Sequence, residues 1–218
     1  LNEAPDITSN GGGSTAGFFV PENSTSVTTV TAVDPDADTT LSFSILDGAD
    51  AALFNLNSSS GVLTFKTKPD YETRLDANAD NFYEVRVEVS DGSLSDFQSM
   101  SISIQNVNEN PTDLALSPGS VPENLASGTG VGSFTTTDPD ADNIFSYTLV
   151  SGIGSTDNSS FNIIGDVLYT GAAFDFELQS SYSIRVRTTD QGGLTFEKVF
   201  TITVTDGNDA PLDILLSN

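Results

Sequence analysis

The sequence predicts an all-β protein built from two tandem β-sandwich domains. Gly, Pro, Ser, Thr, Asp and Asn are abundant, and no long segment has the apolar periodicity of a helix, which favours strands joined by turns. Several segments alternate apolar and polar residues, and one ordered set of short motifs occurs twice. Together, the alternation and the repetition predict two copies of the same β unit.

The repetition follows the order of the chain, with about a hundred residues between equivalent motifs. The pairs are "VPEN" at 20–23 and 121–124, "DPDAD" at 34–38 and 138–142, "PDYE" at 69–72 and "FDFE" at 174–177, "VSDG" at 89–92 and "TTDQ" at 188–191, and "NVNENP" at 106–111 and "DGNDAP" at 206–211.

The copies set the expected domain boundaries. We expect one repeat at 1–108, whose residues 1–5 ("NEAP" at 2–5) are the tail of a preceding linker, and a second at 109–210. Residues 211–218 read as the start of a following repeat, because they resemble the segment at 112–118. We therefore expect the chain to be part of a longer tandem array.

The alternating segments give the strands and their buried faces. Apolar side chains occupy every second position of four segments: Tyr83 to Val89, Met100 to Ile104, Tyr182 to Val186, and Phe200 to Val204. Each sheet should therefore have one buried and one solvated face, which requires two sheets packed face to face. Short strands with Gly, Asp and Asn turns favour an immunoglobulin-like sandwich.

Composition excludes several functions. The chain has 31 acidic and seven basic residues, a net charge of −24, and neither His nor Cys. Such a charge repels nucleic acid and anionic membranes, and no apolar run is long enough to span a bilayer. Catalytic triads and zinc sites lack their residues, no phosphate-binding glycine motif is present, and we expect no enzyme activity.

The repeated acidic motifs point to a hard divalent cation. Aspartates on alternate residues of an extended segment point the same way and repel one another. Calcium binds six to eight oxygen ligands, which this chain supplies in quantity. An acidic, solvated surface is the alternative, but it gives no reason for the carboxylates to recur at equivalent places in both copies.

The ordered motifs "PEN", "DPDAD", "PDYE", "VSDG" and "NVNENP" resemble the cadherin repeat, most closely the cadherin-like repeats of large bacterial surface proteins. The resemblance implies a seven-stranded Greek-key sandwich with calcium between successive repeats, and two or three ions are expected here. Its implied ligands at the inter-repeat junction are Glu22, Asp70, Glu72, Val107, Asn108, Glu109, Asn110, Asp138, Asp140 and Asp190.

The same resemblance implies two half-sites. The N-terminal half-site comprises Asn2, Glu3, Asp34, Asp36 and Asp91, and the C-terminal one comprises Glu123, Asp175, Glu177, Asn208 and Asp209. An insertion that the second repeat lacks places Asp76, Asn78 and Asp80 on alternate positions. That loop is either an additional calcium site or a solvated turn. Tyr71 and Phe176, at the arginine position of the family motif, are expected to be packing aromatics.

We expect a calcium-binding structural and adhesive module of a long extracellular or cell-surface protein, in which calcium rigidifies the array. Its partners would be calcium ions, neighbouring repeats of the same chain and, in an adhesive role, polysaccharide or like repeats on another cell. The alternative is a carbohydrate-binding or homophilic recognition module that uses the sandwich loops. The absence of Trp disfavours a sugar-binding platform.

Overall fold

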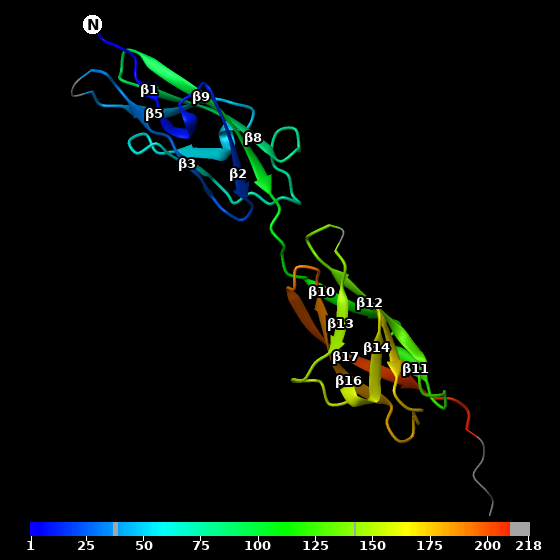
Figure 1. Cartoon of the computed structure of the whole chain (residues 1–218). Coiled ribbons are helices and arrows are strands. Elements are labelled where there is room, and N and C mark those ends of the chain that lie inside the picture. Colours follow the sequence, from blue (N-terminus) through cyan, green and yellow to red (C-terminus); the bar gives the residue numbers. More distant parts are fainter. Residues whose placement is uncertain (37–38, 142, 210–218) are drawn as a thin grey trace, which may run out of the picture. The chain divides into compact units, whose positions relative to one another are not determined.

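The computed structural model describes residues 1–36, 39–141 and 143–209. The described chain is all-β and divides into two compact units, Leu1–Val107 (unit 1) and Asn108–Asn218 (unit 2) (Figure 1). Asp38 and Asp142 of the two DPDAD motifs, and the predicted start of a following repeat at 211–218, lie outside the described residues.

Unit 1 contains two main sheets and a short pair of strands. The four-stranded sheet has the order β2 (Thr15–Pro21), β9 (Ser95–Gln105), β8 (Phe82–Ser90), β5 (Ser42–Asp47). The three-stranded sheet has the order β3 (Ser26–Thr29), β7 (Val62–Phe65), β6 (Phe54–Leu56), while β1 (Asp6–Ile7) pairs with β4 (Ala32–Val33). Two 3₁₀ turns complete the unit, η1 (Ser9–Gly11) and η2 (Ala51–Leu53).

Unit 2 contains two four-stranded sheets. The first has the order β11 (Ser120–Pro122), β17 (Thr195–Thr205), β16 (Ser181–Thr189), β13 (Ser146–Leu149). The second has the order β10 (Asp113–Ser117), β12 (Gly130–Thr137), β15 (Val167–Thr170), β14 (Phe161–Ile164), with the 3₁₀ turn η3 (Asn158–Ser160) before β14. The parallel pair at the sheet edge differs between the units, since β2 matches seven residues of β9 and β11 only three of β17.

The predicted alternation places the core of each unit. Val87 and Ile102 are fully buried in unit 1, as are Ile184 and Ile202 in unit 2, while their sequence neighbours face outward. Burying one side of each sheet against another sheet supplies the main stabilising free energy of such a domain. The expected sandwich strands are therefore confirmed in both copies.

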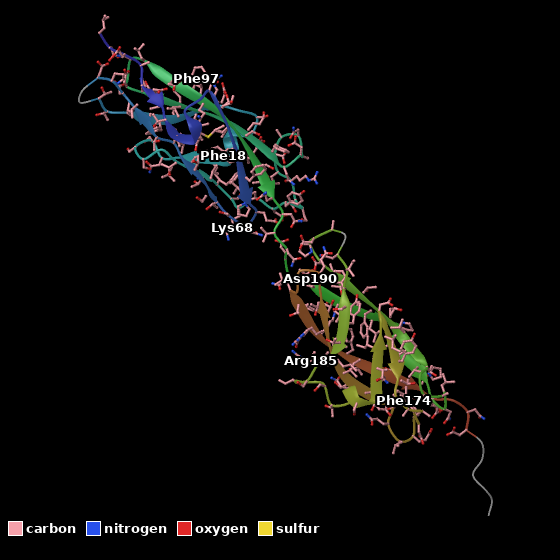
Figure 2. All side chains as sticks on the ribbon, viewed as in Figure 1. Phe18, Lys68, Phe97, Phe174, Arg185 and Asp190 are labelled. Carbon is pink, nitrogen blue, oxygen red and sulfur yellow. The ribbon has the colours of Figure 1, made fainter. Side chains whose placement is uncertain are left out.

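The strand directions collect the acidic motifs at the ends of the units. Because β2 and β9 are parallel, Glu22 and Val107, which follow these strands, lie at the same end of the sheet. Because β1 and β4 are antiparallel, Glu3 before β1 lies near the residues that follow β4. Asp190 and Phe174 lie at opposite ends of unit 2 (Figure 2). Each unit thus carries one acidic cluster near each end.

Candidate metal centre

The C-terminal cluster of unit 1 is organised around Glu22, a buried carboxylate. Its Oε2 accepts a hydrogen bond from the amide of Tyr71 at 2.8 Å, and its Oε1 accepts one from the amide of Val107 at 2.8 Å. Oxygens of Glu22 and Glu72 lie within 4.8 Å of each other. Asp70 Oδ1 accepts the amides of Glu72 and Thr73, which fixes the turn that carries Glu72.

Unit 2 builds the same arrangement from different residues. Buried Glu123 accepts the amides of Phe176 at 2.8 Å and Gly207 at 2.6 Å, and these bonds lower its pKa. Oxygens of Glu123, Asp175 and Glu177 lie within 4.8 Å of one another. The backbone amide of Glu177 tends to lower the pKa of its own side chain, but desolvation and the neighbouring carboxylates Glu123 and Asp209 outweigh it and raise the pKa.

The N-terminal cluster of unit 1 joins three separate segments. Asn2 Nδ2 donates to Asp91 at 2.8 Å, the amide of Glu3 donates to Asp36 at 2.7 Å, and the amide of Asp36 donates to Asp34 at 2.8 Å. The predicted N-terminal half-site residues are thus brought together in the structure.

The N-terminal cluster of unit 2 repeats these contacts bond for bond. Asn108 Nδ2 donates to Asp190 at 2.9 Å, the amide of Glu109 donates to Asp140 at 2.7 Å, and the amide of Asp140 donates to Asp138 at 3.0 Å. Burial tends to raise the pKa of Asp190, but the hydrogen bonds from Asn108 and from the turn amides hold it below its ordinary value.

One buried carboxylate oxygen of each N-terminal cluster has no hydrogen-bond partner among the described residues. These atoms are Oδ2 of Asp34 and Oδ2 of Asp138. Burial raises the pKa of Asp138, and the carboxylates of Asp140 and Asp190 raise it further. A buried acceptor that faces like charges is costly unless a cation balances it. Hard oxygen donors without His or Cys fit calcium.

Asn143 is a candidate ligand that the sequence reasoning missed. Its Nδ2 donates to the carbonyl of Asp140 at 3.4 Å, and its buried Oδ1 has no partner among the described residues. In unit 1, Thr39 makes the corresponding bond to the carbonyl of Asp36. The sequence signal was a polar residue three positions after the second aspartate of each DPDAD motif.

The 76–80 loop is only partly a solvated turn. Asn78 and Asp80 are exposed, but Asp76 is only 6% exposed and accepts the amides of Asp80 at 2.7 Å and Asn81 at 3.1 Å. Both carboxylate oxygens of Asp76 therefore accept hydrogen bonds from backbone amides, which hold the loop closed. A cation in this loop stays a prediction.

Other predicted ligands have few contacts in the described structure. Asn110 is exposed, and Asn208 donates a weak bond to the carbonyl of Asp209 at 3.4 Å, while Asp209 itself accepts Asn124 Nδ2 at 2.8 Å. Carbonyl ligation by Val107 and Asn110 stays a prediction. Tyr71 and Phe176 pack against the two cores, which confirms the expected packing role.

The cadherin domain model matches residues 17–105 and again residues 117–205. The chain belongs to the cadherin family. Both matches follow the strand repeats and the acidic motifs described above, so the expected resemblance is confirmed. Cadherin domains belong to adhesion proteins and are not enzymes, which agrees with the absence of a catalytic constellation in the sequence.

Similar proteins include human protocadherin-16, which is 30% identical over 197 residues covering 85% of this chain and 6% of that protein. Chimpanzee protocadherin gamma-A10 is 31% identical over 211 residues, covering 88% and 21%. The chain thus spans a small fraction of these curated relatives. The relatives named here are mammalian, and the bacterial source stays a prediction.

Solved structures support the fold. The first two repeats of human protocadherin-24 match with a TM-score of 0.68 and 20% identity, covering 94% of this chain and all of that one. Repeats 22–24 of mouse cadherin-23 match with a TM-score of 0.65 and 23% identity, covering 96% of this chain and 68% of that one.

The cadherin assignment places the chain outside the cell or at its surface. Among the described residues, no helix is long and apolar enough to cross a membrane.

Proposed function

We propose that this chain is a calcium-binding structural and adhesive module, in which calcium joins successive repeats into a stiff array. Support comes from the buried, unpartnered Oδ2 atoms of Asp34 and Asp138, which occupy equivalent places in the two units. Bound calcium would supply the positive charge that these clusters lack. The chain's own residues would supply and orient the oxygen ligands.

Covalent geometry supports a shared site between repeats. Val107 donates its amide to Glu22 in unit 1, and Glu109 donates its amide to Asp140 in unit 2. Two residue steps of extended chain reach at most about 7 Å, so these two anchored residues are close by connectivity alone. Glu109 is thus the residue that we expect to share calcium between both clusters.

The same contacts indicate which role each ligand residue would have. Glu22 and Asp140 are held by backbone amides in orientations that need no metal, so the ligands are preorganised. Asp138, Asp140 and Asp190, whose carboxylates face one another, would contribute negative charge that the cation balances. Glu72, which lies beside Glu22, would complete the ligand set from unit 1.

Calorimetric titration of the whole chain with calcium tests this proposal. We expect saturable binding with more than one ion per chain, and dissociation constants on the order of 10⁻⁴ to 10⁻³ M for the weakest sites. A titration with no heat above dilution, together with unchanged melting in calcium and in chelator, would refute it. The carbohydrate-binding alternative gains no support from the described contacts or from the comparisons.

A further inference from the structure

The connection from Glu72 to Tyr83 in unit 1 is longer than its counterpart in unit 2. Ten residues separate Glu72 from Tyr83, whereas four separate Glu177 from Tyr182. The two tyrosines are equivalent, since each is the second residue of its strand, β8 or β16. We call residues 76–81 of the longer connection, with the sequence DANADN, the acidic loop. Unit 2 completes the same sandwich without it, so the fold does not require this loop.

Buried Asp50 anchors the acidic loop to the sheet. Its Oδ2 accepts the amide of Glu84 at 2.8 Å, and its Oδ1 accepts the amide of Ala77 at 2.7 Å. In unit 2, Asp157 accepts the equivalent strand amide at 2.7 Å, and Nε2 of Gln179 donates to its other oxygen at 3.4 Å. One glutamine side chain thus takes the place of the loop amide. Support of the sheet therefore does not explain the polar side chains of the acidic loop.

The acidic loop has the spacing of the first half of an EF-hand calcium loop. Asp76, Asn78 and Asp80 stand at the first, third and fifth positions, which supply side-chain oxygens in loops of that type. The sixth position makes a sharp turn, usually with Gly. Asn81 makes that turn here, with a φ of 64°. The second half of such a loop is replaced by strand β8, which begins at Phe82.

Hydrogen bonds hold the acidic loop in this shape. Asp76 accepts the amide of Asp80 on one oxygen and the amide of Asn81 on the other. An ionised carboxylate has about four acceptor positions, so about two of those on Asp76 remain for a ligand. The exposed side chains of Asn78 and Asp80 meet at 2.9 Å, so both lie on the same side of the loop. Three oxygen-bearing side chains are thus brought together by the loop itself.

The side chain of Asn81 points to a ligand independently of the carboxylates, because it is only 4% exposed and has an unsatisfied oxygen. Its Nδ2 donates to the carbonyl of Tyr71 at 2.9 Å, and its backbone amide donates to Asp76. The side chain is therefore enclosed between the segment at Tyr71 and the acidic loop. Its buried Oδ1 has no hydrogen-bond partner among the described residues. A buried acceptor in this state is costly unless something that is not part of the chain binds it.

The N-terminal cluster of unit 2 contains an asparagine in the same state. Asn143 also donates through Nδ2 to a carbonyl, that of Asp140, and its buried Oδ1 has no partner in the described part of the chain. Asp138 carries another such oxygen. In that cluster, calcium is the partner proposed above. The acidic loop combines the same kind of unsatisfied oxygen with the same ligand chemistry, which favours the same kind of partner.

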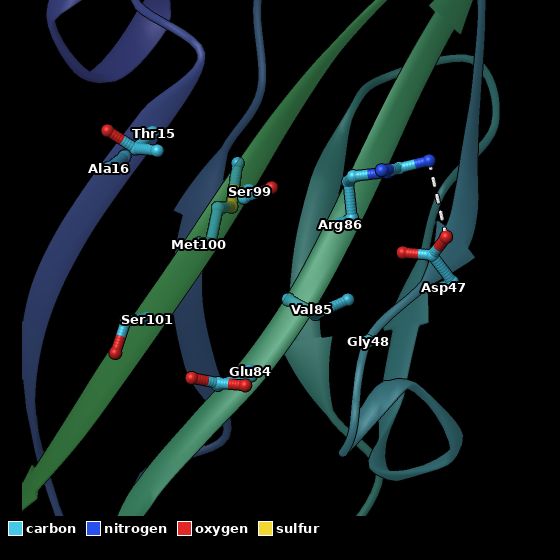
Figure 3. A pocket seen from close by; sticks show the side chains of 10 residues that line it. All are labelled: Thr15, Ala16, Asp47, Gly48, Glu84, Val85, Arg86, Ser99, Met100 and Ser101. Carbon is cyan, nitrogen blue, oxygen red and sulfur yellow. Dashed lines mark ion pairs between the residues drawn. The ribbon is translucent and has the colours of Figure 1, made fainter.

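Basic side chains of unit 1 do not balance the acidic loop. Where an aspartate of unit 1 lies beside an arginine, the two form an ion pair: Asp47 and Arg86 lie 3.2 Å apart at a hollow of about 290 Å³ that Ser99 also lines (Figure 3). Neither carboxylate of the acidic loop forms such a pair among the described residues. Arg74, two residues before the loop, donates to a backbone carbonyl of the loop instead. The negative charge of the loop is thus left for a cation.

We propose that the acidic loop binds a calcium ion of its own, separate from the ions between repeats, through Asp76, Asn78, Asp80 and the Oδ1 of Asn81. Calcium accepts irregular sets of oxygens, whereas magnesium demands an octahedron. Only two of these side chains are charged, and the bidentate Glu that ends an EF-hand loop has no counterpart in this set. We therefore expect a dissociation constant on the order of 10⁻³ M. The site depends on the proposed function only for the presence of calcium around the chain.

Hydrogen exchange of backbone amides, measured by NMR on the 218-residue chain in calcium and in chelator, tests the proposal at the loop itself. An ion that binds only the closed loop reduces the open population by the factor 1 + [Ca²⁺]/Kd. In about 10 mM calcium, exchange of the amides of residues 77–81 should therefore be about tenfold slower than in chelator. The ratio of the two rates is the readout, because a purely structural effect changes both rates equally.

Asp80→Asn and Asn81→Gly test the ligands. The first keeps an oxygen for the amide of Phe82 and removes a charge, and the second accepts a positive φ and removes the buried oxygen. Each should bring the ratio of rates close to one and bind one calcium ion fewer in equilibrium dialysis, with circular dichroism confirming the fold. Asp166→Asn is the matched control, since Asp166 is an exposed carboxylate of unit 2, and it should behave as wild type.

Asp140→Asn separates this site from the calcium between repeats. It should weaken binding at the junction and leave the calcium-dependent protection of residues 77–81 unchanged. Loss of that protection in Asp140→Asn would show that the acidic loop responds to the junction ions, and it would overturn the proposal. Equal exchange of wild type in calcium and in chelator would overturn it too, since the Oδ1 of Asn81 would then bind a water molecule only. Neither result would remove the calcium proposed at the junction, which calorimetry tests separately.

Discussion

Replacing Asp140 by Asn separates the cost of the carboxylate cluster from the benefit of its cation. Asn has the same shape, and its carbonyl oxygen can still accept the 2.7 Å bond from the amide of Glu109. The change therefore removes a charge and keeps a contact. Without calcium, the pKa of Asp138 should fall, because Asp140 is one of the charges that raise it.

The substitution should change the stability of the calcium-free protein and that of the calcium-bound protein in opposite directions. In chelator, the variant should be at least as stable as wild type, because repulsion in the cluster is relieved. In calcium, wild type gains about 2.7 kcal/mol from a site at a hundredfold excess over its dissociation constant. For a domain of this size, that gain corresponds to roughly 10 to 20 °C in melting temperature. The variant should lose most of it.

Thermal unfolding of both proteins in calcium and in chelator measures the effect. Asp166→Asn is the control, since Asp166 is an exposed carboxylate of unit 2 outside both clusters. Its calcium-dependent rise should equal that of wild type. An equal rise in Asp140→Asn would refute the assignment of this carboxylate to a cation. A similar loss of melting temperature in calcium and in chelator would show that Asp140 stabilises the fold without binding a cation.

Three further predictions address selectivity, packing and pH. Magnesium should stabilise the chain much less than calcium at equal concentration, because it demands a compact octahedron and gives up water reluctantly; equal melting shifts would contradict this site. Leu63→Ala should destabilise unit 1 by about 2 to 5 kcal/mol in urea unfolding, because Leu63 is fully buried, and a loss under 1 kcal/mol would mean that the core collapses around it. Arg187 and Arg185 lower the pKa of Glu197, so its charge should stabilise the fold above about pH 4.3 and lose that effect as the pH falls through the lower folded-state value. Urea midpoints of Glu197→Gln should therefore fall less steeply with acid than those of wild type, and parallel curves would rule this out.

Local pattern alone determined the sandwich strands and the acidic motifs. Alternation at Val85, Val87 and Met100, Ile102 encodes which side of a strand is buried, because successive side chains point to opposite faces. Repetition of the motifs encodes two equivalent units, because each motif belongs to one structural position of the repeat. These features depend on neighbours in sequence, so the sequence by itself determined them.

Contacts between distant segments could not be read in this way. The burial of Asp76, the partnerless oxygen of Asn143 and the amide bonds that hold Glu22 all depend on which loops meet at the end of a sheet. A sequence pattern gives the face of a residue but not what covers that face. For that reason only the tertiary structure decided that Gly154, in the loop between β13 and η3, packs against Val199 of β17, and that the shorter loop between β5 and η2 leaves a hollow beside Ser99 in unit 1.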